Sequence, residues 1–309
     1  MHLNIPSPVE LLSHPLFEEN LIEVYVKRDD LIHPEISGNK WRKLKLNIER
    51  VHSGRYEGIL SFGGAYSNHI SALASVGKAL NIPTIGIIRG DELNAKSNST
   101  LAKASELGMK LVFVSREEYG WRYEKDYKNQ LRIRFGNYLI VEEGGANFYG
   151  ALGCTEILSE VNFPVDHIFL AAGTGTTTAG ILIGNHEAKV TCVPVFKNGG
   201  FIRDDIKELL IFSGLDDEAV NEKLEQLNLD LSAHFGGYGK YNQDLIDFIN
   251  TFYRETHLKL DQVYTGKMFY ALVEAIKRGS INRGEKVLAI HTGGLQGTLS
   301  IAERLNFSV

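Results

Sequence analysis

The chain has 309 residues, of which 43% are hydrophobic and 23% charged, so it can form one large or two closely packed globular domains. A net charge of −5 gives no reason to expect nucleic acid or an anionic membrane as a partner. Two cysteines, Cys154 and Cys192, are too few for a disulfide scaffold or a zinc site. We therefore expect no metal site. The start MHLNIPSPVE shows no secretory signal and no run reaches about 20 apolar residues, so we expect a cytoplasmic protein.

The segment SGNKWRKL, residues 37–44, places Lys40, Arg42 and Lys43 at the start of a predicted helix. Apolar residues recur at helical spacing from there on, and Asn39 is a favourable N-cap residue. Positive charge is unfavourable at this end of a helix unless an anion lies nearby. The segment therefore predicts an anionic ligand.

Short apolar runs alternate with helical patterns along most of the chain. The runs predict strands at 58–62, 84–88, 110–114, 167–172, 190–195 and 286–290. Helical patterns lie between them, for example at 67–80 and 99–107. This alternation is typical of α/β proteins with parallel sheets flanked by helices. We expect a small α/β domain at 52–145 and a larger domain built from 1–51 and 146–309.

A glycine- and threonine-rich turn follows the predicted strand at 167–172, in the sequence HIFLAAGTGTTTAG. Backbone amides and hydroxyls at such a helix start can bind a phosphate. A dinucleotide site fits poorly, because Gly180 is misplaced and the strand at 190–195 is followed by Phe196 and Lys197 without an acidic residue. A Walker loop is excluded because the turn does not end in Gly-Lys-Ser/Thr.

A second turn, GGAYSNH, places Ser67, Asn68 and His69 at the end of the predicted strand 58–62. Simple helix capping and ligand binding are both compatible with this position. Further glycine turns at 143–150, 235–239, 264–267 and 291–297 make a shared ligand cleft the better interpretation.

Lys40 and Lys43 are three residues apart and so share a helix face. One could form a Schiff base with a phosphorylated cofactor while the other contacts its phosphate. The motifs KRDDLIHPEISGNKWRKL, GGAYSNH, EEGGANFYGALG, AAGTGTTTAG, GGYGKY, YTGK and HTGG, in this order, resemble the pyridoxal-phosphate family of 1-aminocyclopropane-1-carboxylate (ACC) deaminase and D-cysteine desulfhydrase. The resemblance implies the two-domain fold type II, which is tryptophan synthase β-like, with pyridoxal 5'-phosphate as cofactor and a homodimeric assembly.

The resemblance also implies roles for individual residues. Lys40 matches the Schiff-base lysine and Lys43 the lysine that contacts phosphate. The phosphate loop matches Gly173, Thr174, Gly175, Thr176 and Thr177.

Around the substrate, Asn68 matches the residue beside the cofactor ring, and Ser67 the serine that meets the substrate carboxylate or takes part in proton transfer. Tyr238 and Tyr264 match two active-site tyrosines, and Thr265 the partner of the pyridine nitrogen.

The resemblance implies a small amino-acid substrate that yields ammonia and an α-keto acid. Thr265, Thr292 and His69 stand where ACC deaminases carry glutamate, leucine and glutamine, which favours D-cysteine desulfhydrase-like β-elimination to pyruvate, sulfide and ammonia. The alternatives are ACC deamination to 2-oxobutyrate and ammonia, another D-amino-acid lyase or racemase, or β-replacement as in cysteine synthase. A storage module for the cofactor and a nucleotide-dependent oxidoreductase are weaker interpretations.

Overall fold

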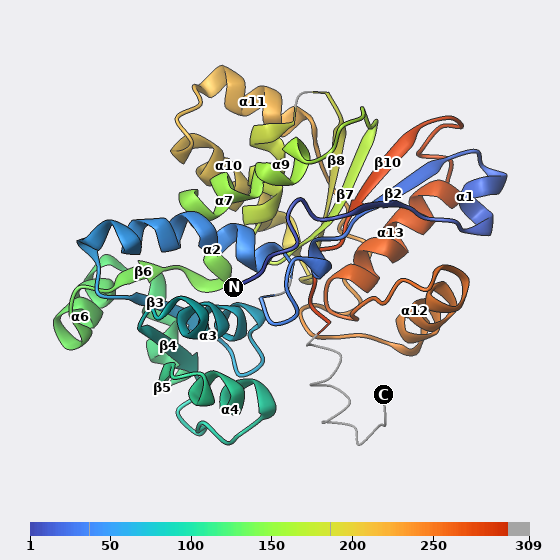
Figure 1. Ribbon diagram of the computed structural model, residues 1–309. Helices are drawn as coiled ribbons and strands as arrows, with labels where there is room; N and C mark the ends of the chain where they lie inside the picture. The colour runs from blue at the N-terminus through green and yellow to red at the C-terminus, as the bar shows by residue number, and fades with distance from the viewer. Residues whose placement is uncertain (37, 186, 296–309) are drawn as a thin grey trace.

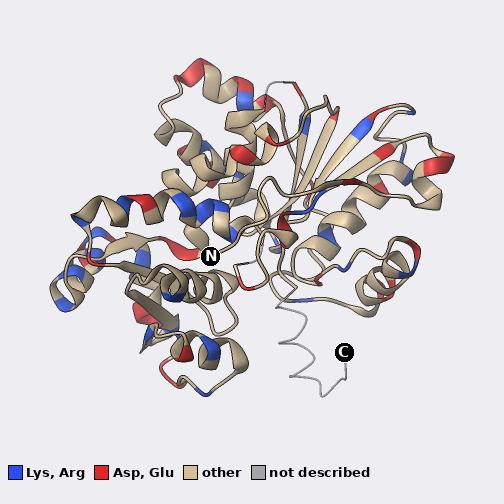
Figure 2. Ribbon diagram, in the orientation of Figure 1, with Lys and Arg blue, Asp and Glu red and all other residues tan. Residues whose placement is uncertain are grey.

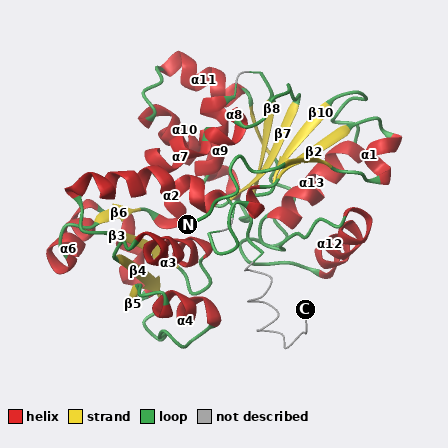
Figure 3. Cartoon of the chain, in the orientation of Figure 1, coloured by secondary structure: helices red, strands yellow, loops and turns green. Residues whose placement is uncertain are grey.

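The computed structural model describes residues 1–36, 38–185 and 187–295, and it is built from two sheets flanked by helices (Figures 1 and 3). The larger sheet has six strands, in the order β1 (Val9–Leu11), β2 (Glu23–Lys27), β10 (Lys286–Ile290), β7 (His167–Ala172), β8 (Lys189–Pro194) and β9 (Leu227–Leu229). The smaller has four, in the order β5 (Lys110–Val114), β4 (Thr84–Arg89), β3 (Ile59–Gly63) and β6 (Leu139–Val141). All neighbouring strands are parallel except β1 and β2, which confirms the predicted fold class.

Helices cover both faces of the six-stranded sheet. One face carries α1 (Pro15–Glu19), α12 (Gln243–Thr256) and α13 (Thr265–Lys277). The other carries α7 (Phe148–Cys154), α8 (Glu156–Ser159), α9 (Thr176–Gly184), α10 (Ile202–Phe212) and α11 (Asp217–Glu225). Side chains alternate along β7, so that Phe169 packs into the first layer and Ile168 and Leu170 into the second. Strands β7, β8 and β10 are buried on both faces of the sheet, which explains why their sequences are almost continuously apolar.

The four-stranded sheet is covered in the same way. Its first face packs against α2 (Asn39–Arg50), α3 (Asn68–Leu80) and α4 (Ser99–Glu106), and its second against α5 (Arg116–Gly120) and α6 (Lys125–Phe135). Short 3₁₀ turns occur at Asp29–Leu31, Trp121–Tyr123, Glu143–Gly145 and Gly199–Phe201, and a π turn at Val51–Arg55 extends α2.

Helix α2 contributes to both halves of the molecule. Trp41, Leu44 and Ile48 belong to the core above the four-stranded sheet. On its other side α2 packs closely against α7, where a Cβ on Gly153 would lie 2.0 Å from the carbonyl oxygen of Arg42. A domain boundary at residue 52 would therefore run along a helix that is packed on both sides, and the predicted division into 52–145 and the rest of the chain stays a prediction.

The six predicted strands all form, with ends that differ by at most one residue from those expected. Strands β1, β2, β6 and β9 were not predicted. Most charged residues of the six-stranded sheet lie at strand ends, such as Glu23 and Lys27 of β2, while α2 carries several cations near its start (Figure 2). Both cysteines are buried in the core around α7 and α9. Among the described residues, no helix combines the length and apolar character needed to cross a membrane.

Candidate active site

A large cleft, about 1610 Å³ in volume, opens at the carboxyl ends of strands from both sheets. Its lining comes from the turns that follow β3, β6, β7 and β10, together with the first turn of α2. Parallel strands deliver their carboxyl ends to one edge of a sheet, so polar turns distant in sequence meet there. The shared cleft expected from the glycine turns is present, although Gly297 lies outside the described residues.

Lys40 and Lys43 both line this cleft from the first turn of α2. Contrary to the predicted N-cap, Asn39 is the first helical residue, and Gly38 occupies the cap position without a capping side chain. The Asn39 side chain acts in the cleft instead. Its Oδ1 accepts a hydrogen bond of 2.8 Å from Lys40 Nζ, and its Nδ2 donates one of 2.7 Å to Thr177 Oγ1.

The protein environment lowers the pKa of both lysines. Burial, and after it the charge of Lys43, lowers the pKa of Lys40 to about 7. Burial also lowers the pKa of Lys43. The Lys43 side chain is 5% exposed, and within the described part of the chain its ammonium has neither a hydrogen bond nor an ion pair. A buried ammonium of this kind favours an anion bound in the cleft.

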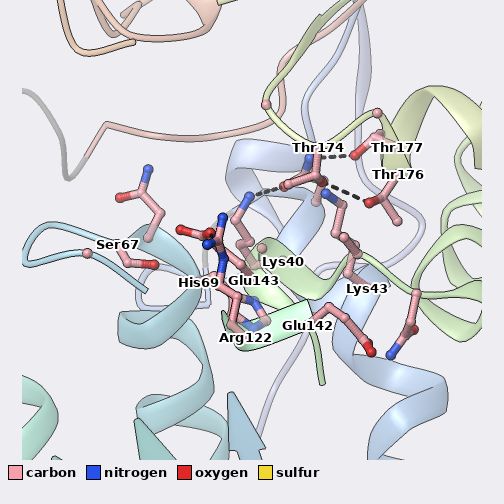
Figure 4. Close-up of a pocket in the computed structure, with 18 of the residues that line it drawn as sticks. Lys40, Lys43, Ser67, His69, Arg122, Glu142, Glu143, Thr174, Thr176 and Thr177 are labelled. Atoms are coloured by element: carbon pink, nitrogen blue, oxygen red, sulfur yellow. Dashed lines mark hydrogen bonds and ion pairs between the residues drawn. The ribbon is translucent and has the colours of Figure 1, made fainter. Parts of the chain in front are cut away.

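The threonine-rich turn faces Lys43 across the cleft, and Figure 4 shows Lys43 extending toward Thr174, Thr176 and Thr177. Helix α9 begins at Thr176, and its N-cap residue Gly175 has a φ of 67°, a conformation that glycine adopts without strain. Within the described part of the chain no capping side chain occupies this helix end, so its first amides lack a helical or capping partner, and Gly175, Thr176 and Thr177 line the cleft. The amides, the hydroxyls of Thr174, Thr176 and Thr177, and the Lys43 ammonium together form a site for a phosphate group.

The second predicted ligand turn caps a helix and also lines the cleft. Ser67 is the N-cap of α3, and its Oγ accepts a hydrogen bond of 3.3 Å from the amide of Ile70. Ser67, Asn68 and His69 all line the cleft. The capping and ligand interpretations of this turn are therefore compatible in one structure.

The two predicted tyrosines meet in the cleft. The rings of Tyr238 and Tyr264 lie 6.2 Å apart in an edge-to-face arrangement, at an angle of 72°. Desolvation raises the pKa of both hydroxyls, most strongly that of Tyr264, while the Tyr238 side chain as a whole is about half exposed, so both hydroxyls keep their protons at neutral pH. They are therefore available as hydrogen-bond donors.

Thr265 lies outside the cleft lining, whereas Thr292 belongs to it. Thr265 is fully buried, and its Oγ1 donates a hydrogen bond of 2.7 Å to Asp261 Oδ1 while accepting one of 2.9 Å from the Asp261 amide. Asp261, not singled out from the sequence, does line the cleft. A contact between Thr265 and a pyridine nitrogen stays a prediction.

Further cleft residues were also missed. Arg122 forms an ion pair with Glu143, with 2.9 Å between Nε and Oε2, and its guanidinium lies over the rings of Tyr119 and Tyr123. Arg122 comes from residues 91–138, to which no motif assigned a function. Glu143 belongs to the EGGANFYG turn, so the motif was a signal for Glu143 but not for its partner.

Comparisons with known proteins agree with this geometry. A family model described as "Pyridoxal-phosphate dependent enzyme" matches residues 3–293. A putative ACC deaminase from Pyrococcus furiosus is 30% identical over 92% of this chain and 88% of its own. The bifunctional D-cysteine desulfhydrase/ACC deaminase of Arabidopsis thaliana is 29% identical over 95% of this chain and 77% of its own. The crystal structure of an ACC deaminase homologue superimposes with a TM-score of 0.80 at 26% identity, covering 99% of this chain and 94% of that one.

Proposed function

Since the chain belongs to the pyridoxal-phosphate dependent enzymes, in the group that includes ACC deaminase and D-cysteine desulfhydrase, we propose that it releases the β-substituent of a small D-amino acid. With D-cysteine the products are pyruvate, sulfide and ammonia. The observation that carries this proposal is the Lys40 amine, which lies in the cleft with a pKa lowered to about 7.

The residues of the cleft fit pyridoxal phosphate. Among the residues that the structure describes, no carboxylate pairs with the Lys43 ammonium, and the N-terminus of α9 with its threonines supplies amides and hydroxyls for a phosphate. We assign the phosphate to this end of the cleft and the covalent attachment to Lys40. Gly173 keeps the turn close to Tyr264, because a Cβ there would lie 3.3 Å from the tyrosine ring.

The bound cofactor supplies an electron sink for the bond broken at Cα. Lys40, once its amine is free, takes the proton from Cα. An amine with a pKa near 7 is a suitable general base at neutral pH, because much of it is unprotonated. Asn39 holds this amine through its Oδ1 at 2.8 Å, which limits where the proton can be delivered.

The remaining polar groups bind and orient the substrate. The first amides of α3, with Ser67 and Asn68, form an anion site suited to the substrate carboxylate. Tyr264, which keeps its proton, donates a hydrogen bond to the departing sulfur, and the Tyr238 ring packs edge to face against it. Thr292 borders the same space.

The choice between D-cysteine and ACC rests on the Cα proton. D-Cysteine has one for Lys40 to remove, while ACC has none, so its ring must be opened by another route. The named relatives include both activities, and ACC deamination is therefore the alternative outcome of the test.

The test is a paired product assay of the holoenzyme with D-cysteine and with ACC, identifying the keto acid by mass. Pyruvate and sulfide from D-cysteine alone support the proposal, while 2-oxobutyrate from ACC at a comparable rate contradicts it. L-Serine formed from D-serine, or consumption of an added thiol, would identify a racemase or a β-replacement enzyme instead.

Lys40→Ala is expected to abolish turnover and the visible absorbance of the bound cofactor. Lys45→Ala is the matched control, because Lys45 lies on the same helix, pairs with Glu156 and is not part of the cleft lining. A homodimeric assembly and a cytoplasmic location stay predictions.

A further inference from the structure

Lys267, the last residue of the YTGK motif, is fully buried, and its ammonium lies among carbonyl oxygens. Its Nζ donates hydrogen bonds of 2.8 Å to the carbonyl oxygens of His234 and Gly237 and one of 3.5 Å to that of Val195. No carboxylate among the described residues forms an ion pair with it. An ammonium has three donors and no acceptor, so three carbonyl oxygens match it. Burial, partly offset by the charge of Asp261, lowers the pKa of Lys267 to about 8, so the ammonium form predominates at neutral pH.

The three carbonyl groups belong to two segments that are distant from Lys267 in the sequence. Val195 directly follows β8. His234 and Gly237 belong to the turn at 234–240, which we name the Tyr238 turn. Lys267 itself lies in the first turn of α13. One side chain therefore joins the end of β8, the Tyr238 turn and the start of α13.

The Tyr238 turn has a backbone that its own sequence leaves free to adopt many conformations. Phe235, Gly236, Gly237 and Gly239 all have positive φ values, between 48° and 120°. Glycine loses more conformational freedom on folding than any other residue, so contacts from outside the turn are needed to fix it. Gly237 is buried, whereas Tyr238 is exposed. The hydrogen bond from Lys267 therefore acts on the residue directly before Tyr238.

The same ammonium also holds the segments that carry the two rings in contact with Tyr238. Val195 precedes Phe196, whose ring stacks on that of Tyr238 at 5.5 Å and an angle of 19°. Tyr264 lies three residues before Lys267, and its ring meets that of Tyr238 edge to face at 6.2 Å. Each of the three rings thus belongs to a segment that Lys267 contacts or contains.

We propose that Lys267 is a positioning residue that holds the Tyr238 turn and so places the Tyr238 ring against Phe196 and Tyr264 at the cleft. Lys267 is fully buried and is not part of the cleft lining, so it acts on the site only through this turn. Its role in the reaction rests on the proposed function, in which Tyr264 acts on the departing sulfur. The hold on the turn does not depend on that reaction.

Limited trypsin digestion of the holoenzyme, with fragments identified by mass, tests the hold. Lys240 in the Tyr238 turn and Lys96 in the loop between β4 and α4 are both exposed. Lys267→Met keeps much of the side-chain length and removes the charge and the donors. It is expected to raise the cleavage rate at Lys240 at least tenfold and to leave the rate at Lys96 within twofold. Lys27→Met is the matched control, because Lys27 is also fully buried but pairs with Glu160, and it is expected to change both rates by the same factor.

Unchanged cleavage at Lys240, or an equal rise at both sites in Lys267→Met, overturns the proposal. Lys267→Gln is uncharged but can still donate two hydrogen bonds, so its cleavage rate at Lys240 is expected to lie between those of the wild type and Lys267→Met. If neither variant folds, as judged by circular dichroism, Lys267 supports the whole molecule rather than one turn, and the proposal is overturned as well.

A double-mutant cycle with D-cysteine tests the link to the reaction. Lys267→Met is expected to lower kcat/KM at least tenfold in the wild-type background. In a Tyr238→Ala background the further loss is expected to stay within twofold, because the ring that Lys267 places is already missing. Additive losses, or no loss in Tyr238→Ala alone, overturn the proposal and leave the proposed function intact. If the wild-type holoenzyme gives no pyruvate from D-cysteine, the proposed function fails, while the digestion still decides whether Lys267 holds the turn.

Discussion

The guanidinium of Arg42 forms two parallel hydrogen bonds with the carboxylate of Asp29, of 2.9 Å from Nε to Oδ2 and 2.8 Å from Nη2 to Oδ1. Both side chains are fully buried. Arg42 also forms two hydrogen bonds of 2.8 Å with Glu160, whose Oε2 accepts a further one from Lys27. This network joins α2, β2 and the end of α8, and so fixes the helix that carries Lys40.

Removing one partner from this network is expected to be costly, because it leaves a buried charge without compensation. We expect Asp29→Asn or Arg42→Met to lower the free energy of unfolding by about 3–5 kcal/mol. Urea unfolding followed by circular dichroism measures the change. The control is Arg116→Ala, which breaks an exposed ion pair with Glu92 and is expected to leave the unfolding midpoint nearly unchanged. Equal effects of the buried and exposed substitutions would contradict this account.

The same network predicts how stability depends on pH. Burial alone would raise the pKa of Glu160, but hydrogen bonds from Arg42 and Lys27 lower it to about 2. A carboxyl whose pKa is depressed by folding stabilises the protein above its unfolded pKa, and this contribution disappears as the pH falls through the folded pKa. We therefore expect the stability difference between wild type and Glu160→Gln to shrink between about pH 4.5 and pH 2. A difference that is constant over this range in urea unfolding would contradict the expectation.

Most of the strands that could be predicted from sequence are buried on both faces, while β5, at the edge of its sheet, is only partly buried but has an apolar run after Lys110. Runs such as HIFLAA are apolar without interruption, so β3, β4, β5, β7, β8 and β10 are visible in the sequence. Strand β2 was not predicted because it contains a charged residue, Lys27, that is fully buried. The partner of Lys27 is Glu160, which is 133 residues away in the sequence. No local sequence pattern can indicate that a lysine will be buried when the carboxylate that pairs with it is so distant in the sequence. Strands β1, β6 and β9 have three residues each, too few for a pattern.

The candidate site shows the same limit. The polar turns, Lys40 and Lys43 could be placed in one cleft because parallel strands gather their carboxyl ends. Arg42, however, points away from the cleft and pairs with Asp29 and Glu160, so among the described residues Lys40 and Lys43 are the cations at the helix start that have no anionic partner. The hydrogen bond between His69 and Ser61, and the one that Ser61 donates to Val141, form only after β3 and β6 have paired.

Gly38 allows α2 to begin close to the end of β10. Its φ is 65°, and a Cβ there would lie 1.8 Å from the carbonyl oxygen of Thr292. We expect Gly38→Ala to lower the free energy of unfolding by more than about 3 kcal/mol, because the backbone of one segment must move. Gly54 is the matched control. It also has a positive φ, 79°, but its Cβ would meet no atom within 4 Å.

Gly54→Ala should therefore show the conformational strain alone, about 1 kcal/mol. Thermal and urea unfolding of both variants separate the two contributions. Similar losses at the two positions would mean that the contact with Thr292 relaxes easily and does not restrict the start of α2.

Cofactor uptake by the apoenzyme is expected to depend on the protonation of Lys40. Only the unprotonated amine can react with the aldehyde of pyridoxal phosphate. Because burial and the charge of Lys43 lower the pKa of Lys40 to about 7, the unprotonated fraction rises about tenfold from pH 6 to pH 8. The rate at which the absorbance of the bound cofactor appears should rise by the same factor at saturating cofactor and level off above pH 8.

Lys43→Gln removes the neighbouring charge but leaves the burial of Lys40 in place. It should therefore shift this rate profile to higher pH, because one of the two causes that lower the pKa is lost. Lys45→Gln, on the same helix but outside the cleft lining, should leave the profile where it is in the wild type. A profile that is flat between pH 6 and pH 8, or that moves equally in both variants, would contradict the assignment of the titrating amine to Lys40.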